Sequence, residues 1–216
     1  MVTTGSSSSL IILENGDRLS RDEFERRYTA SQIKKAELIE GIVYVAAPLR
    51  FVPHGKPHSN IVTWLGTYQA LVAGSDMGLE VGIEPTVRMD SDNEPQPDVV
   101  LFRIGGNAVI DADGYIAGAP ELIAEIAAST ASYDLHTKKR ISEKNGVKEY
   151  IVWRTLDQQI DWFMLENGAY CQVEPDALGM IRSREFTGLW LDVAGMLRHD
   201  MAAVLRVLQM GLDSCM

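Results

Sequence analysis

Hydrophobic residues recur along the chain with two different periods, and together they predict a mixed α/β fold. Apolar side chains at helical spacing predict an amphipathic helix over residues 58–73. Two short apolar runs, 97–102 and 121–127, are typical of strands that are buried on both faces. We therefore expect these runs to be adjacent central strands of a mixed β-sheet, flanked by the 58–73 helix and a second helix over 131–145.

Shorter patterns complete the predicted fold. Ser20 and Glu23 form a capping box that begins a helix ending near Thr29. The other expected elements are a hairpin over 36–46 that turns near Glu40 and Gly41, strands over 79–89 and 148–153, a hairpin over 159–173 that turns at Asn167 and Gly168, and a helix over 200–210. We expect one domain over residues 17–216, preceded by a flexible, serine-rich lead-in at residues 1–16.

The composition is that of an ordinary globular protein. The 216 residues are 46% hydrophobic and 23% charged. No apolar run approaches the roughly 18 residues that a membrane helix needs. The two cysteines, Cys171 and Cys215, form neither a disulfide framework nor a CxxC metal site. These features predict a cytoplasmic protein that has no membrane partner.

The net charge of −10 argues against a protein that binds nucleic acid through a broad basic surface. Positive charge is nevertheless concentrated between Asp134 and Lys148, where five basic residues stand against two acidic ones. This stretch is either a solvated helix face or part of a nucleic-acid cleft. On the second interpretation, four cations are candidates for a positive rim: Lys138, Lys139, Arg140 and Lys144.

Two carboxylates interrupt the apolar strands. Asp98 precedes Val99 and Val100, and Glu125 lies within the 121–127 run. A carboxylate inside an apolar strand is costly unless a hydrogen-bond network, a cationic partner or a metal ion compensates it. On neighbouring strands, Asp98 and Glu125 would supply oxygen ligands for Mg²⁺ or Mn²⁺. Such an ion polarises a phosphate and activates a water for in-line attack.

Lys138 is the candidate that complements the two carboxylates. It falls near the middle of the helix that follows the Glu125 strand, so the chain returns across the sheet beside that strand. A lysine at this place could donate to the scissile phosphate or orient the attacking water. A solvent-exposed helical lysine is the alternative.

Several segments, in order, resemble a known family. Gln96, Pro97 and Asp98, followed by Glu125, resemble the split metal motif of the PD-(D/E)XK phosphodiesterases. More narrowly, residues 20–175 are similar to the Uma-type family of restriction endonucleases. The matching segments are 37–41, Pro57 with His58, 96–102, 119–125, Ser129 with Thr130, Tyr133 with Asp134, Lys138, and 146–150.

The resemblance implies a restriction-endonuclease-like fold, a divalent metal held by Asp98 and Glu125, and catalysis by Asp98, Glu125 and Lys138. Two positions depart from the family patterns. The superfamily lysine stands two residues after the glutamate, where this chain has Ala127, and the Uma-type lysine instead falls on Lys138. Ser142 stands where that family has an aromatic residue.

Other polar residues have weaker claims. His58 could touch a substrate phosphate or a metal-bound water, or it could simply cap or pack the start of its helix. One of Glu37 and Glu40 could reach the metal cluster, whereas Asp134 is expected to cap a helix. The acidic turn formed by Asp90, Asp92 and Glu94 could bind calcium weakly or bind nothing.

The function that these observations favour is a divalent-metal-dependent endonuclease that acts on DNA. An RNA nuclease cannot be separated from it by sequence, and an inactive nuclease-fold module for oligomerisation or partner binding is the alternative from another class. A homodimer is expected by analogy, because duplex cutting needs two sites. Since paired carboxylates repel each other, we expect Asp98→Asn to be at least as stable as the wild type in chelator.

Overall fold

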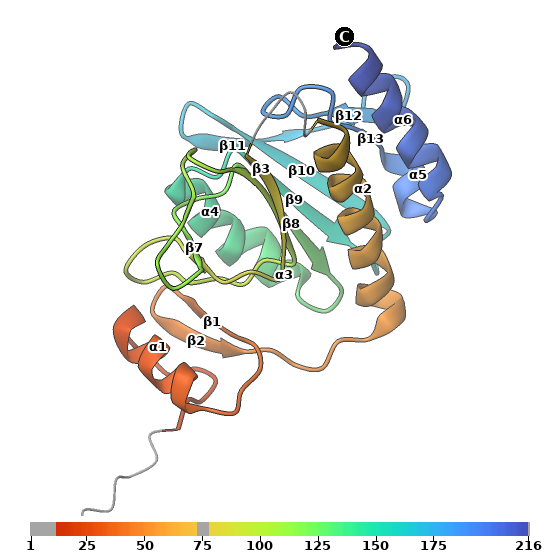
Figure 1. The fold of residues 1–216 in the computed structure, drawn as a ribbon. Helices are drawn as coiled ribbons and strands as arrows, with labels where there is room; N and C mark the ends of the chain where they lie inside the picture. The colour runs from red at the N-terminus through yellow and green to blue at the C-terminus, as the bar shows by residue number, and fades with distance from the viewer. Residues whose placement is uncertain (1–11, 73–77, 216) are drawn as a thin grey trace, which may run out of the picture.

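The computed structural model describes residues 12–72 and 78–215, and its centre is a six-stranded mixed sheet (Figure 1). The strand order is β11-β10-β9-β8-β5-β3. The strands are β3 (Leu79–Ile83), β5 (Val99–Arg103), β8 (Leu122–Ala127), β9 (Glu149–Arg154), β10 (Gln159–Glu166) and β11 (Ala169–Val173). Strands β8 and β9 are parallel, and the other neighbours in this sheet are antiparallel. The predicted adjacency of the two apolar runs is confirmed, because β5 pairs with β8.

Helices cover both faces of this sheet. One face packs against α2 (Lys56–Val72), α5 (Val193–Leu197) and α6 (Met201–Asp213), and its core includes Trp64 and Trp162 with ring centroids 5.9 Å apart. The other face is covered by the crossover between β8 and β9, which consists of α3 (Ala131–Tyr133), the π-helical segment η2 (Asp134–Lys138) and α4 (Lys139–Asn145). Both predicted flanking helices are therefore present, although the second is interrupted by η2.

A small N-terminal unit lies at one end of the sheet (Figure 1). It consists of α1 (Arg21–Ala30) and the hairpin of β1 (Ala36–Ile39) and β2 (Ile42–Val45), packed around the buried Phe24. Only half of the capping box forms: the Ser20 hydroxyl accepts from the Glu23 backbone, while the Glu23 carboxylate binds arginines of its own helix. The hairpin is joined to the rest of the fold by two backbone hydrogen bonds between Leu38 and Glu94.

The predicted strand over 79–89 is two strands. Glu84 adopts a positive φ of 48° and Pro85 follows it, so the backbone turns and loses a donor. Beyond this break, β4 (Val87–Arg88) leaves the central sheet and pairs with β7 (Ile116–Ala117), which also pairs with β6 (Val109–Ile110). The break matters for the site, because the Glu84 backbone N–H donates to the Asp98 carbonyl and fixes the start of β5.

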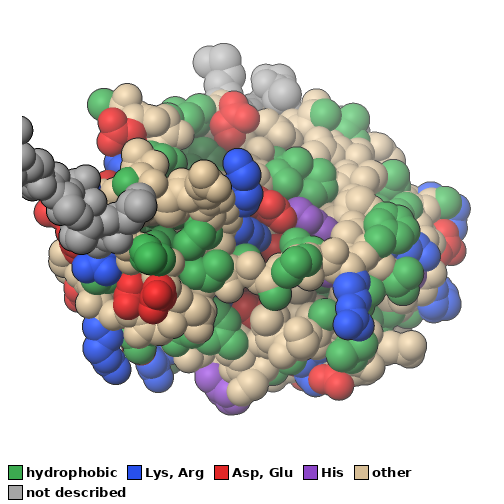
Figure 2. Space-filling view, turned by 90° about the horizontal axis from the view of Figure 1, so that it is seen from below, with side chains coloured by type: hydrophobic (Ala, Val, Ile, Leu, Met, Phe, Trp, Pro, Cys, Tyr) green, Lys and Arg blue, Asp and Glu red, His purple; other side chains and the backbone are tan. Residues whose placement is uncertain are grey.

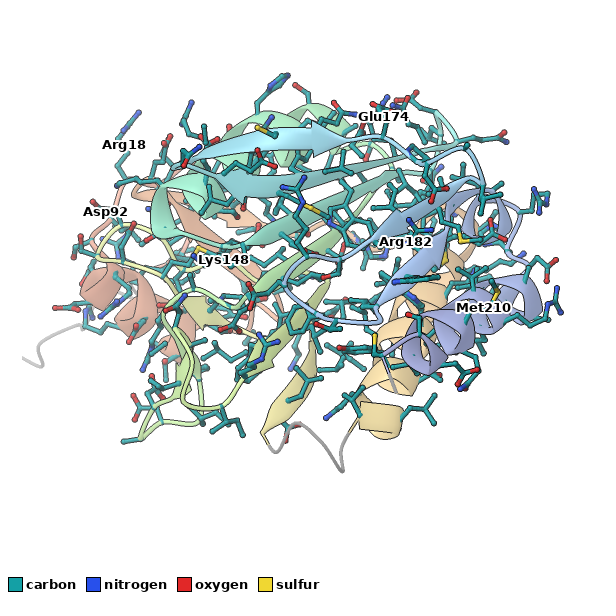
Figure 3. All side chains as sticks on the ribbon, turned by 90° about the horizontal axis from the view of Figure 1, so that it is seen from above. Arg18, Asp92, Lys148, Glu174, Arg182 and Met210 are labelled. Atoms are coloured by element: carbon teal, nitrogen blue, oxygen red, sulfur yellow. The ribbon has the colours of Figure 1, made fainter. Side chains whose placement is uncertain are left out.

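The C-terminal region closes one side of the molecule. The ribbon of β12 (Met180–Arg182) and β13 (Trp190–Asp192) lies beside α6, which carries Met210 (Figure 3). The predicted terminal helix is thus present, with the Asp200 carboxylate accepting from the Ala203 N–H at its start.

The predicted lead-in at residues 1–16 falls mainly on residues 1–11, which lie outside the described residues, as does Ala73 at the expected end of the 58–73 helix. Within 12–16, Leu13 is buried against the N-terminal unit. Among the described helices, none is both long enough and apolar enough to cross a membrane.

Candidate active site

Asp98 and Glu125 face each other across two neighbouring strands. The antiparallel register pairs Val99 with Ala124, and one step further it places Asp98 opposite Glu125. Each carboxylate accepts a hydrogen bond from the other strand: Asp98 Oδ2 lies 2.7 Å from the Ile126 N, and Glu125 Oε2 lies 3.4 Å from the Asp98 N. Both residues are buried. The sheet therefore fixes two carboxylates side by side on the face that the crossover helices cover.

Lys138 points into this pair and not to solvent. It ends the η2 segment, and its Nζ lies 3.0 Å from Glu125 Oε1 and 2.8 Å from Glu37 Oε1, which comes from β1. All three side chains are buried. The N-terminal hairpin, the central sheet and the crossover thus each contribute one charged group to the same cluster.

A histidine and a further lysine contact Asp98. His54 Nε2 lies 3.2 Å from Asp98 Oδ2, and Lys35 Nζ lies 3.7 Å from Asp98 Oδ1. His54 is buried in η1 (Phe51–Gly55), a π-helical turn that leads into α2. His58, one turn later, reaches the Asp98 backbone carbonyl at 3.0 Å from its Nε2. The His58 side chain therefore supports the strand start in this structure, and a contact with substrate stays a prediction.

The electrostatic balance differs between the two carboxylates. For Asp98, burial raises the pKa, but the hydrogen bond and charge of His54, the charge of Lys35 and the Ile126 N–H outweigh it and lower the pKa to about 2. For Glu125, burial raises the pKa well above its usual range; Lys138 opposes this rise, and the charges of Asp98, Asp134 and Glu37 add to it. Asp98 is thus held as a carboxylate, whereas burial disfavours the charged form of Glu125, which depends on the nearby Lys138 ammonium.

Lys138 stays an ammonium group in this surrounding. Burial lowers its pKa, but the carboxylates of Glu125, Glu37 and Asp134 outweigh burial and raise the pKa well above the ordinary value. One buried ammonium is therefore shared by three nearby acidic groups. For Asp134, its charge does not outweigh burial, and the pKa of Asp134 is raised as well.

The cluster lies in a cleft of about 980 Å³. Its charged lining contains four acidic residues and three basic ones besides two histidines: Glu37, Asp98, Glu125, Asp134, Lys35, Arg50, Lys138, His54 and His136. Figure 2 shows acidic, basic and histidine side chains together in a hollow of this face, with hydrophobic side chains beside it. In the described part of the chain, the Tyr133 hydroxyl and His54 Nδ1 are buried without a hydrogen-bond partner, so the cleft offers polar groups to a ligand.

Of the four cations that were candidates for a positive rim, only Lys138 lines the cleft. Arg140 pairs with Glu40 at 2.7 Å, and Lys144 lies 3.8 Å from Asp90; both line a separate shallow pocket. Lys139 lies over the Phe163 ring at 4.2 Å. The physical reason is the helical geometry: successive helical positions point in different directions, so of these four cations only Lys138 points into the cleft.

Several secondary expectations are also resolved. Asp134 is not a helix cap; it lies buried inside the helical crossover and its Oδ2 accepts from the Thr130 hydroxyl at 2.6 Å. Of the two hairpin glutamates, Glu37 reaches the cluster and Glu40 does not.

Two departures noted in the sequence have a structural setting. Ala127 is the last residue of β8, two positions after Glu125, and is buried in the core. Ser142 is buried one turn beyond Lys138. The aromatic ring near the lysine belongs instead to Tyr133, with its centroid 5.9 Å from Nζ.

His54 and Lys35 are the site residues that sequence reasoning missed. His54 precedes His58 by four residues, a spacing that places two side chains on one helical face and that could have marked it. Lys35 precedes the first hairpin strand and carries no sequence signal, because only the docking of the hairpin brings it to Asp98.

Comparison with known proteins identifies the family. The family model described as "Uma2: Putative restriction endonuclease" matches residues 21–194. The chain belongs to this family. Among curated proteins, none matches it.

A solved structure shares the fold. The crystal structure of a putative nuclease belonging to DUF820 from Anabaena variabilis ATCC 29413 has a TM-score of 0.59 and 17% sequence identity, over 80% of this chain and 96% of that one. The fold of the chain is therefore restriction-endonuclease-like, as the Uma2 family membership implies.

The donor set fits a hard divalent cation in its chemistry. Carboxylate oxygens are the ligands that Mg²⁺ and Mn²⁺ prefer, and Asp98 and Glu125 present them on one face of adjacent strands. Within the described ranges, no three Asp, Glu, His or Cys side chains converge as a ready-made ligand group. The reason lies in the pairing: Glu37 and Glu125 point at Lys138, and Asp98 points at His54. Water would supply the remaining ligands.

Proposed function

We propose that this chain is a divalent-metal-dependent endonuclease that cuts phosphodiester bonds in DNA, with Asp98 and Glu125 as metal ligands. The observation that carries the proposal is the convergence of these two carboxylates and Lys138 in one cleft of a chain that belongs to a family of nuclease type. A divalent ion held there would polarise the scissile phosphate and make an attacking water more acidic.

The chain's own residues divide the remaining work. Lys138 is an ammonium at the floor of the cleft, so it is suited to donate to a phosphate oxygen or to orient a water. His54 and Lys35 hold Asp98 in its ionised state, in which it can bind a cation. The unpartnered Tyr133 hydroxyl is a further donor for a substrate oxygen.

A non-catalytic binding module is the second candidate. It is favoured by the net charge of −10 and by the lack of the expected positive rim. The same phosphoryl chemistry would also serve RNA, and the homodimer expected by analogy stays a prediction that sedimentation velocity would test.

Calorimetric titration with Mg²⁺, beside cleavage of plasmid DNA, tests the proposal. We expect the wild type to bind the ion and to cut, Asp98→Asn to lose both, and Lys138→Ala to keep binding while cleavage falls, because the lysine acts on phosphate or water and not on the ion. Asp113→Asn, at an exposed acid outside the cleft, is the matched control and should behave as the wild type. Equal Mg²⁺ binding by the wild type and Asp98→Asn would show that the proposed site is wrong.

A further inference from the structure

The mouth of the cleft carries an exposed hydrophobic lip. Leu49, Phe51, Val52 and Leu156 are 54%, 72%, 72% and 70% exposed. Leu49 and Leu156 line the cleft, and Phe51 and Val52 lie between two other lining residues, Arg50 and Pro53. Among the described residues, Phe51 is the most exposed aromatic side chain. Hydrophobic side chains beside the hollow are visible in Figure 2.

The lip is held rigidly relative to the carboxylates. Its two segments are joined by a hydrogen bond from the Thr155 hydroxyl to the Pro53 carbonyl, at 2.8 Å. Phe51 begins the π-helical turn that contains His54, and His54 binds Asp98. The Phe51 ring also packs so closely on Gly55 that a Cβ there would lie 3.3 Å from it. A group stacked on Phe51 is thereby kept at a fixed place beside the site.

The charge of the cleft limits which nucleic acid it can bind. Of the three Lys and Arg side chains that line it, Lys35 and Lys138 are paired with carboxylates, and three cations of the 134–148 stretch lie elsewhere. Binding of intact duplex DNA depends strongly on cationic contacts with phosphates. A single strand gains affinity in another way, because each exposed base can stack on an aromatic side chain, which is worth about 1–3 kcal/mol per base.

From these observations we infer that the lip is a base-stacking platform, and that the substrate is a nucleic acid with unpaired bases at the cleavage point: a single strand, a flap or a distorted duplex. The inference rests on the proposed function and specifies its substrate class. Phe51 receives the base next to the scissile phosphate, Leu49 and Leu156 border it, and Arg50 is the nearby cation for the backbone.

The test is fluorescence anisotropy with one labelled oligonucleotide, offered as a single strand and as a duplex, in Ca²⁺ to limit cleavage. We expect the wild type to bind the single strand at least about tenfold more tightly than the duplex. Phe51→Ala should weaken single-strand binding by about 5-fold to 150-fold, the equivalent of about 1–3 kcal/mol. Phe51→Tyr keeps a ring and should bind like the wild type.

Leu178→Ala is the matched control, because Leu178 is as exposed as Phe51 (72%) but lies outside the cleft. Cleavage of the same two substrates in Mg²⁺ distinguishes the failures. If the wild type cuts the duplex well, and Phe51→Ala binds and cuts both substrates like the wild type, the stacking inference is overturned while the nuclease function stands. If neither form is bound or cut, both are overturned. If Phe51→Ala changes only the sedimentation coefficient, the lip is a contact between copies of the chain, and the inference is overturned.

Discussion

Two buried glutamates, one directly before β8 and one within it, have surroundings that are opposite in kind. Glu121, directly before β8, is sealed by backbone donors: its Oε2 accepts from the Arg103 N at 3.0 Å and its Oε1 from the Asn107 N at 3.4 Å. Glu125, four residues later, faces the Lys138 ammonium in a cleft. Both are equally hidden from solvent. Burial of a carboxylate therefore does not mark a functional site; the nature of its partner does.

The two glutamates differ in whether their hydrogen-bond partners can be replaced by a ligand. Backbone N–H groups at Glu121 are fixed by the chain, so that carboxylate pins the loop after β5 and has no capacity for a ligand. A lysine side chain can move, so the oxygens of Glu125 can be shared with an incoming cation. Four predictions use this contrast.

The largest effect is expected for Lys138→Ala. Removal of this ammonium leaves Glu125 and Glu37 buried without their cation, and breaking a buried ion pair costs about 3–5 kcal/mol. Urea unfolding in chelator should show this loss, and Mg²⁺ should recover part of it. Lys139→Ala, the neighbouring lysine over Phe163, is the control and should lose no more than about 1 kcal/mol. Equal stability of the two variants would contradict the account.

Asp98→Asn comes next, and here the structure reverses the sequence expectation of unchanged or greater stability. The pKa of Asp98 is lowered to about 2 by His54 and Lys35 against burial, so the carboxylate form is stabilised in the folded state. Loss of charged hydrogen bonds should cost about 1.5–3 kcal/mol in chelator at neutral pH. Because the pKa is depressed, this contribution is present above the unfolded value of about 3.9 and disappears as pH falls towards 2. Unfolding midpoints at pH 7 and pH 2.5 measure it; an identical difference at both would contradict the assignment.

Glu121 and Glu125 give the direct comparison. Glu121→Gln removes an acceptor from fixed backbone donors and should cost about 1–3 kcal/mol without changing Mg²⁺ binding. Glu125→Gln should cost less, because burial already favours the neutral form of that side chain, but it should abolish Mg²⁺ binding. Urea unfolding and Mg²⁺ calorimetry on both variants measure the two effects. If one variant showed both the larger loss of stability and the loss of Mg²⁺ binding, the contrast would be contradicted.

The last prediction concerns a further buried carboxylate, Glu94, beside Glu25. Burial and the neighbouring Glu25 raise its pKa to about 8, against the charges of Arg88 and Arg21. A raised carboxyl pKa gives a contribution that is full below the unfolded value and is lost as pH rises through about 8. The wild type should therefore lose stability between pH 5 and pH 9 relative to Glu94→Gln. Parallel pH profiles of the two proteins would disprove it.

Sequence patterns were sufficient for the central sheet and its covering helices. The apolar runs around Val99 and Ala124 predicted β5 and β8 because strands buried on both faces have few alternatives. The small sheet of β4, β6 and β7 was not predicted, since two-residue strands carry no periodic signal.

The site was predictable in its carboxylates and not in their partners. Asp98 and Glu125 stood out because charge inside an apolar strand is unusual. Lys35 reaches Asp98 only through tertiary docking and carries no sequence signal, whereas His54 could have been marked only by its four-residue spacing from His58. The same limit explains the wrong rim: a run of cations does not reveal which side of the helix meets the sheet.

The Leu38–Glu94 backbone bridge has a consequence for the order in which the site forms during synthesis and folding. Glu37 lies next to Leu38, and its carboxylate reaches Lys138, a residue a hundred positions later in the chain. β8 becomes an inner strand only when β9, ending at Arg154, pairs beside it. A nascent chain therefore carries its first acidic group long before the lysine that completes the cluster has been synthesised. The full constellation exists only after this long-range closure, because Glu37 reaches Lys138 only when the N-terminal hairpin is docked.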